Sequence, residues 1–199
     1  GIDISPYPTT HSVPSCAWRI SQADRPGRFD GQRADELGLS NQEIAQLAGG
    51  KDLEKDGQTL LSEQFRGDDR SGLSLLISGD TGAEAPGLVA LSADKPLNLM
   101  VHEATYVDEQ EEQARNYLHS TARDAGTAAT TADAAHLVLT HYSSRLSESE
   151  TSLMQARLVH RAVCCAEDGD IFIISEGGEV QLFRHHEGEL NEIPAPFVD

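Results

Sequence analysis

Short apolar runs recur along the chain, and a polar cluster follows each of three of them. These runs are "LSLLIS", "LNLMV" and "HLVLT", within residues 73–140. Apolar runs of this length predict buried strands. The stretches at about 108–118 and 121–134 predict helices, and residues 2–20 predict two short strands around a loop. Strands that alternate with helices in this way are typical of an α/β fold.

The polar clusters carry residue types that bind metals. Asp80 follows the first run, His102 and Glu103 follow the second, and His141 follows the third. Ligands in α/β sheets bind beyond the carboxyl ends of the strands, so we expect these clusters to converge on one edge. Zinc binds imidazole nitrogen and carboxylate oxygen, and in open sites it lowers the pKa of a bound water to about 7. The spacing is not a local metal motif, and each residue taken singly is more typical of a turn former or a hydrogen-bonded histidine.

A fourth cluster, "HSTARDAG", stands at the start of a predicted helix. Thr121 and Asp124 have the spacing of an N-cap residue and its third-position acid. The free N–H groups and the positive dipole end of such a helix start favour an anion, phosphate above all. His119 beside that anion could donate a proton to a leaving oxygen. The alternative is that Ser120 and Thr121 only cap the helix and that His119 is solvated.

Residues 22–68 differ from the rest of the chain. They are rich in Arg, Asp, Gly and Gln, and they contain one amphipathic segment, "DELGLSNQEIAQL", which predicts short helices. We therefore expect an insertion at 22–68 in a core formed by residues 1–21 and 69–199. The densest basic stretch of the chain overlaps the start of this insertion, and acidic residues interleave it, so a solvated surface of mixed charge is one interpretation.

Composition limits the class of protein. A chain of 199 residues, 38% hydrophobic and 24% charged, fits one domain with a core plus an appendage. No apolar run reaches the roughly 20 residues of a membrane helix, and Gly1-Ile2-Asp3 lacks the basic start of a signal peptide. The few cysteines predict no disulfide framework and hence a reducing, cytoplasmic location: Cys16, Cys164 and Cys165. Predicted core residues include Met100, Phe172 and Ile173.

The chain is strongly acidic, with 33 Asp and Glu against 15 Lys and Arg and a formal net charge of -18. At low ionic strength this charge repels phosphates and argues against a nucleic-acid partner. Near 1 M salt the Debye length falls to about 3 Å, so the repulsion largely disappears. Two interpretations follow: a halophilic protein from a salt-adapted organism, or an acidic mesophilic protein.

Taken in order, five segments resemble the ribonuclease Z family, the 3′ tRNA-processing endonucleases of the metallo-β-lactamase fold. They are "PTTHSVPSCAWRI", "SGDT", "HEATY", "HSTA" and "LTHYSSR". One such segment alone would be weak evidence for the family, but five segments in this order, each with the expected strand or helix context, are specific evidence. The segment "RISQADRPGRFDGQRADELGLS" is similar to the family's protruding arm that grips tRNA. The resemblance implies a metallo-β-lactamase-like αββα sandwich, two zinc ions in a complete site, precursor tRNA as substrate, and a homodimer.

The resemblance also implies roles for individual residues. The implied metal ligands are His11, Asp80 and His141. The implied catalytic residues are His119 as proton donor and Glu103, which supports the site. Arginine suits bidentate contact with phosphate, and the implied substrate contacts are Thr121, Ser143, Arg145 and, in the arm, Arg25, Arg28 and Arg33.

The family's His-x-His-x-Asp-His motif, which supplies most of its metal ligands, occurs nowhere in residues 1–199. We therefore expect an incomplete core, the C-terminal part of the fold, with partial or absent zinc in this chain alone. The expected function is a zinc-dependent endoribonuclease that removes the 3′ trailer of precursor tRNA, or the C-terminal half of one, completed by a chain with the missing motif. The main alternative is a non-catalytic module that holds RNA or a partner chain; a phosphodiesterase for small substrates is a weaker one.

Overall fold

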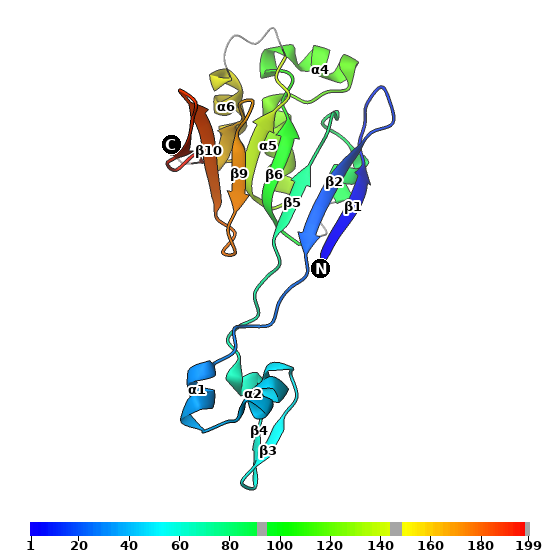
Figure 1. Ribbon diagram of the computed structural model, residues 1–199. Helices are drawn as coiled ribbons and strands as arrows, with labels where there is room; N and C mark the ends of the chain where they lie inside the picture. The colour runs from blue at the N-terminus through cyan, green and yellow to red at the C-terminus, as the bar shows by residue number, and fades with distance from the viewer. Residues whose placement is uncertain (91–94, 144–148, 198–199) are drawn as a thin grey trace. The chain divides into compact units, whose positions relative to one another are not determined.

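The computed structural model describes residues 1–90, 95–143 and 149–197 (Figure 1). The chain divides into two compact units. The larger, here called the core unit, consists of Gly1–Gln22 and Leu73–Asp199, and the smaller, here called the inserted unit, consists of Ala23–Gly72. Each has a hydrophobic core of its own.

A six-stranded sheet forms the centre of the core unit, in the order β1-β2-β5-β6-β7-β8. Its strands are β1 (Ile2–Pro8), β2 (Cys16–Gln22), β5 (Ser74–Ile77), β6 (Leu97–Glu103), β7 (Ala134–Thr140) and β8 (Val163–Cys165). The strands from β1 to β5 pair antiparallel, and those from β5 to β8 pair parallel. The three apolar runs are the neighbouring parallel strands β5, β6 and β7, which confirms the predicted α/β class. Their carboxyl ends therefore lie on one edge of the sheet.

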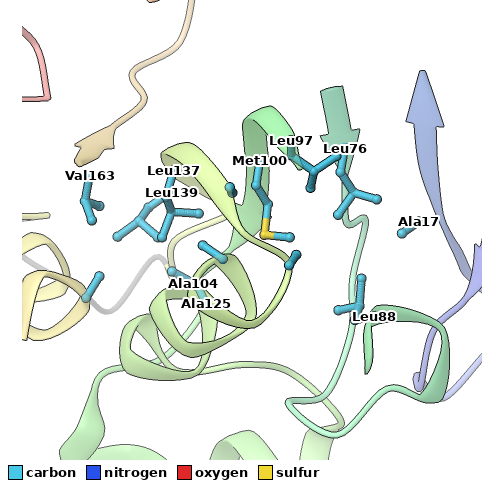
Figure 2. Close-up of a cluster of buried hydrophobic side chains, with 14 of the residues drawn as sticks. Ala17, Leu76, Leu88, Leu97, Met100, Ala104, Ala125, Leu137, Leu139 and Val163 are labelled. Carbon is cyan, nitrogen blue, oxygen red and sulfur yellow. The ribbon is translucent and has the colours of Figure 1, made fainter. Parts of the chain in front are cut away.

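Helices α3, α5 and α6 cover one face of this sheet and bury the cluster drawn in Figure 2. The helical segments of the core unit are α3 (Pro86–Ala90), η3 (Asp108–Gln110), α4 (Glu111–Tyr117), α5 (Ala122–Thr131) and α6 (Glu150–Arg157). Gly126 of α5 lets α6 approach closely, because a Cβ there would lie 2.8 Å from the carbonyl oxygen of Ala156. Met100 is fully buried, as predicted. In the part of the chain that the structure describes, no helix is long and apolar enough to cross a membrane.

A three-stranded antiparallel sheet, in the order β11-β10-β9, packs on the other face. Its strands are β9 (Ile171–Ile174), β10 (Val180–His186) and β11 (Glu189–Ile193). The core unit is thus a helix layer, a large sheet and a small sheet. The prediction that Ile173 is buried is wrong: it is 46% exposed, whereas its neighbours Phe172 and Ile174 pack toward the large sheet.

The inserted unit has a small core of its own. Its elements are α1 (Gly31–Glu36), α2 (Asn41–Ala48), β3 (Leu53–Lys55), β4 (Gln58–Leu60) and η1 (Ser62–Phe65). Leu47 and Phe65 are fully buried, and Phe29 stacks on Phe65 with 5.9 Å between ring centroids. Ser40 begins α2 with a capping box that includes Glu43. The amphipathic segment of the sequence therefore forms the expected short helices.

Candidate metal centre

Five polar side chains come together where the parallel strands end. Asp80 follows β5, Glu103 is the last residue of β6, and His141 follows β7 directly. His11 lies in the loop between β1 and β2, and His119 lies between α4 and α5. His141 has a φ of 58°, a left-handed conformation that is strained for a residue with a side chain. The fold therefore tolerates local strain at the residue that carries this imidazole.

Glu103 is the buried centre of the cluster, with 1% of its surface exposed. Its Oε1 accepts the N–H of Thr81 at 2.8 Å and lies 2.7 Å from Nδ1 of His119. Its Oε2 accepts the hydroxyl of Thr105 at 2.6 Å and two N–H groups, those of Thr105 and Ser120, both at 3.2 Å. A buried carboxylate is tolerated only when its oxygens are hydrogen-bonded in this way. These bonds fix the carboxylate, and it in turn fixes the ring of His119.

Three imidazoles of the cluster carry their proton on Nδ1. His119 donates from Nδ1 to the Glu103 carboxylate. His11 donates from Nδ1 to a backbone carbonyl at 3.1 Å, which can only accept. His141 donates from Nδ1 to the hydroxyl oxygen of Thr105 at 2.8 Å, because that hydroxyl gives its own proton to Glu103. Each Nε2 therefore keeps a lone pair, and histidines that bind metals are typically held by such a bond from the other ring nitrogen.

Two of these Nε2 atoms face the carboxylate of Asp80. Oδ2 of Asp80 lies 3.9 Å from Nε2 of His11, and Oδ1 lies 3.5 Å from Nε2 of His141. The ring of His119 lies between the two others, with centroids at 4.8 Å and 5.4 Å. Donor atoms around a tetrahedral zinc ion are separated by about 3.3 Å. The pairs His11–Asp80 and Asp80–His141 thus have donor types that zinc accepts, at separations near this value, but each pair uses a different oxygen of Asp80.

The possible donors form two groups that share a histidine. The first group is His11, Asp80 and His119, and the second is Glu103, His119 and His141. Within each group all donor atoms lie within 4.8 Å of one another. Because both Glu103 oxygens already accept several hydrogen bonds, this carboxylate is better suited to orient His119 than to bind a metal.

The centre is open on one side. The side chains of Asp80 and His141 are 41% and 49% exposed. They line a cavity of about 490 Å³ whose wall also contains Ser78, Thr140, Tyr142 and Asp168. A second cavity, of about 790 Å³, reaches His119 from the side of the helices. A cation held here would therefore have coordination positions left for other ligands.

Three predicted phosphate contacts of the core unit have different surroundings. Thr121 is buried, and its hydroxyl donates to the Asp124 carboxylate at 2.8 Å and accepts the Asp124 N–H at 3.1 Å, so it caps α5. Ser143 is next to the centre, since its N–H donates to the carbonyl of Thr105 at 3.2 Å. Arg145 lies outside the described residues. The geometry therefore places Ser143 near the cluster and gives Thr121 a capping role.

His102 is not part of the centre, although the strand pattern grouped it there. It is 1% exposed, its Nδ1 donates to the carbonyl of Glu103 at 2.7 Å, and burial lowers its pKa. Successive side chains of a strand point to opposite faces, so His102 and Glu103 cannot share one site. Thr105 is the residue whose role the sequence reasoning missed. Its place in the same polar cluster, two residues after the glutamate, was the available signal.

The inserted unit holds seven of the fifteen basic residues of the chain. The guanidinium of Arg33 donates to the carbonyl of Gln64 at 2.8 Å and lies 5.0 Å from the ring centroid of Phe65. Arg33 is exposed, and its guanidinium supports the surface of the unit through these two contacts as well as carrying charge. The backbones of Arg25 and Arg70 pair where the segment enters and leaves the unit.

Comparisons with known proteins find relatives that are longer than this chain. Ribonuclease Z of Haloferax volcanii is 36% identical over 184 residues, which are 90% of this chain and 55% of that protein. Ribonuclease Z of Halobacterium salinarum is 34% identical over 199 residues, 99% of this chain and 58% of that protein. The chain thus spans little more than half the length of these relatives. No protein-family model matches.

A solved structure shares the fold. The metallo-β-lactamase fold protein YhfI from Bacillus subtilis has a TM-score of 0.53 and 17% identity, with 84% of this chain and 48% of that chain covered. The predicted metallo-β-lactamase class is therefore confirmed for the part of the fold that this chain contains.

Proposed function

We propose that this chain, which is related to ribonuclease Z along nearly its whole length, supplies the C-terminal part of a zinc-dependent endoribonuclease. The reaction is hydrolysis of the phosphodiester that joins a precursor tRNA to its 3′ trailer. The observation that supports this proposal best is the set of three imidazoles whose Nδ1 atoms are all held by acceptors. Turn formation and helix capping need no such arrangement, whereas it would orient the rings of His11 and His141 as metal ligands and that of His119 as a proton donor.

In this proposal His11, Asp80 and His141 hold zinc. Each carboxylate oxygen of Asp80 faces a different imidazole, so Asp80 is suited to bridge two ions. Zinc bound there would polarise the scissile phosphate and lower the pKa of a water molecule to about 7. Three ligands for two ions are few, so zinc binding by this chain alone should be weak.

His119 is the proposed general acid, and Glu103 positions it. His119 acts as the acid in its imidazolium form: Nδ1 keeps its proton in the bond to the Glu103 carboxylate at 2.7 Å, and Nε2, which has a lone pair in the neutral ring, takes up from solvent the proton that it then gives to the leaving oxygen. Ring orientation is thereby fixed before the substrate binds. General acids of this kind contribute typically a factor of about 10² to 10⁴ in rate.

Substrate binding is assigned to two regions. Ser143, whose N–H bonds to Thr105 next to the donor cluster, and Arg145, by the family resemblance of its segment, would hold the phosphate at the cleavage position. Residues 22–68, with Arg25, Arg28 and Arg33, would act as the arm that binds the body of the tRNA. This segment carries seven of the fifteen basic residues of the chain, and the clustering of Arg25, Arg28 and Arg33 near its start supports an anion-binding role.

We further propose that the protein is halophilic and cytoplasmic and that it works as a homodimer. Several ribonuclease Z relatives come from Haloferax, Halobacterium, Halorubrum and Natronomonas. At molar salt the net charge of -18 would no longer prevent RNA binding. All three cysteines are free, as expected of a reducing compartment.

The arm separates this function from its rivals. In a protein in which this chain is completed by the segment with the missing motif, deletion of residues 23–72 should weaken precursor tRNA binding and cleavage. Hydrolysis of a small phosphodiester should barely change, because the donors and His119 lie in the core unit. Changing Arg25, Arg28 and Arg33 together to Ala should reduce the slope of log affinity against log salt by up to roughly three, about one for each arginine that no longer binds a phosphate.

Each rival gives another result. An enzyme for small substrates would lose nothing in either assay. A non-catalytic module would lose RNA binding and show no cleavage before or after the deletion. An unchanged salt slope in the triple variant would remove the arm from the proposal.

A further inference from the structure

The cavity on the side of the helices has the size of a small-molecule site. Its volume is about 790 Å³, and sites for small molecules typically have about 300–1,000 Å³. Helices α3, α4 and α5 contribute to its wall, which also contains Thr10 and His119. The proposed metal ligands Asp80 and His141 line the other cavity instead. The two cavities therefore reach the donor cluster at different groups.

Leu118 connects the helix-side cavity with the metal centre. Its side chain lines the cavity, and its carbonyl oxygen accepts the Nδ1–H of His11 at 3.1 Å. Leu118 ends α4 with a φ of 58°, a left-handed conformation that is strained for a residue with a side chain. Strained residues of this kind cluster at active sites and ligand clamps. The backbone that orients a proposed metal ligand thus also places an apolar side chain in the cavity wall.

The charged groups in this wall are mostly acidic. They are three carboxylates and one guanidinium, those of Glu84, Glu111, Asp124 and Arg115. Arg115 pairs with Glu111 on the same helix, so the charge that remains is negative. A phosphate in the cavity would meet like charges and be disfavoured. The helix-side cavity is therefore unsuited to the phosphate itself.

The same wall suits an uncharged ring compound with several hydrogen-bond donors. Carboxylates accept hydrogen bonds from hydroxyl and amino groups. Apolar surface for a flat ring comes from Leu88, Leu118 and Ala128. A nucleoside has both parts, since its base is a flat ring and its ribose carries hydroxyl groups.

The proposed reaction requires a place for such a group beside His119. As general acid, His119 gives its proton to the leaving oxygen, so the nucleoside that carries this oxygen must lie next to His119. In an in-line displacement the attacking oxygen approaches the phosphorus from the opposite side. The nucleoside of the leaving oxygen therefore belongs in the cavity that His119 lines.

We propose that the helix-side cavity binds the nucleoside that carries the leaving oxygen, with its ribose toward His119 and its base against Leu88 and Leu118. The identity of this nucleoside rests on the proposed function, which supplies the leaving oxygen. Recognition of the substrate next to the scissile bond is then a property of the helix layer and is separate from the arm.

The probe is adenosine, titrated into this chain with isotope-labelled Leu and Val methyl groups and followed by NMR. Adenosine should shift the methyl signals of Leu88, Val89 and Leu118, which all line the cavity. Its ribose protons should show nuclear Overhauser effects to the ring of His119. Adenosine monophosphate should bind at least about tenfold more weakly, because its phosphate adds a like charge.

Two variants and one control test the position of the site. Ala128→Phe puts a phenyl ring into the cavity and should weaken adenosine binding at least about tenfold. Leu118→Gly should also weaken binding, since it removes a wall side chain, while glycine keeps the left-handed backbone without strain. Ala135→Phe is the control and should change nothing, because Ala135 is an exposed residue of β7 outside the cavity.

Unchanged signals of the three cavity residues at the solubility limit of adenosine would overturn the proposal. Equal binding of adenosine and its monophosphate, or equal binding by Ala128→Phe and Ala135→Phe, would overturn it too. Overhauser effects to His119 from the base alone would contradict the assigned orientation. The titration involves no cleavage, so a completed protein that cleaves precursor tRNA while adenosine does not bind would overturn this inference alone. Adenosine bound with its ribose at His119, in a protein whose completed form cleaves nothing, would overturn the proposed function and keep the nucleoside site.

Discussion

Replacement of Glu103 by Gln tests whether this carboxylate holds the centre together. The five hydrogen bonds that it accepts all come from buried or half-buried donors. Gln has the same shape but one acceptor oxygen. If that oxygen takes the place of Oε2, the amide nitrogen faces both Nδ1 of His119 and the N–H of Thr81; the imidazole can accept in its other tautomer, but the N–H of Thr81 is left buried and without an acceptor. The other orientation is worse, because three donors then lose their acceptor.

The cost follows from these bonds. One unsatisfied buried N–H costs about 1–3 kcal/mol, and hydrogen bonds to a neutral oxygen have roughly half the strength of those to a carboxylate. Together these terms give about 3–5 kcal/mol, the usual cost of breaking a buried charged network. For a domain of this size that lowers the unfolding midpoint by roughly 6–20 °C.

The assay is thermal unfolding followed by Trp18 fluorescence in the core unit. Glu167→Gln is the matched control, because the side chain of Glu167 is 62% exposed and pairs with Arg184 at the surface. It should lower stability by less than about 1 kcal/mol. Equal midpoints for Glu103→Gln and Glu167→Gln would refute the assigned role of Glu103.

Four further predictions concern stability. Thr121→Ala should cost about 0.5–2 kcal/mol while Thr121→Ser restores the cap, as measured by urea unfolding. Gly126→Ala should cost about 1–3 kcal/mol in the same assay, because its Cβ would lie 2.6 Å from Val159 and 2.8 Å from a carbonyl oxygen; an unchanged midpoint would mean that α5 and α6 pack less closely. Burial lowers the pKa of His102, so the unfolded state binds its proton first and stability should fall as pH drops below about 6.5; His102→Asn, which keeps a donor, should flatten that slope, and an equal slope would contradict the assignment. Because the net charge is -18, the unfolding midpoint should rise between about 0.1 M and 2 M KCl, and full stability in low salt would remove the halophilic proposal.

The sequence predicts the parallel strands and the helix layer well, because their patterns are local. β5, β6 and β7 are apolar runs, and α5 begins with a capping box that can be read from Thr121 and Asp124. The small sheet is less predictable. Ile173 is as apolar as a core residue, but Phe172 and Ile174 are the β9 residues that pack toward the large sheet, and which face of a short apolar strand is buried cannot be read from four apolar residues in a row.

The donor cluster was predictable from strand ends and motif resemblance, but its internal order was not. The sequence places Asp80 and His141 after neighbouring strands, and parallel pairing then brings them to one edge. Tautomers depend on partners distant in sequence, such as the carbonyl near His119 that fixes His11 from 107 residues away. The prediction for His102 was wrong because successive side chains of β6 point to opposite faces of the sheet, so His102 and Glu103 lie on different faces.

The most direct test of the central claim compares turnover and zinc content in a protein in which this chain is completed by the segment that carries the His-x-His-x-Asp-His motif. Precursor tRNA cleavage and bound zinc are measured on the same samples for wild type, His119→Ala and Asp80→Ala. The account predicts that His119→Ala lowers turnover by about 10² to 10⁴ and leaves zinc nearly unchanged, while Asp80→Ala loses both. Equal loss of zinc and turnover in His119→Ala would make this histidine a metal ligand, and full turnover in Asp80→Ala would contradict the metal centre itself.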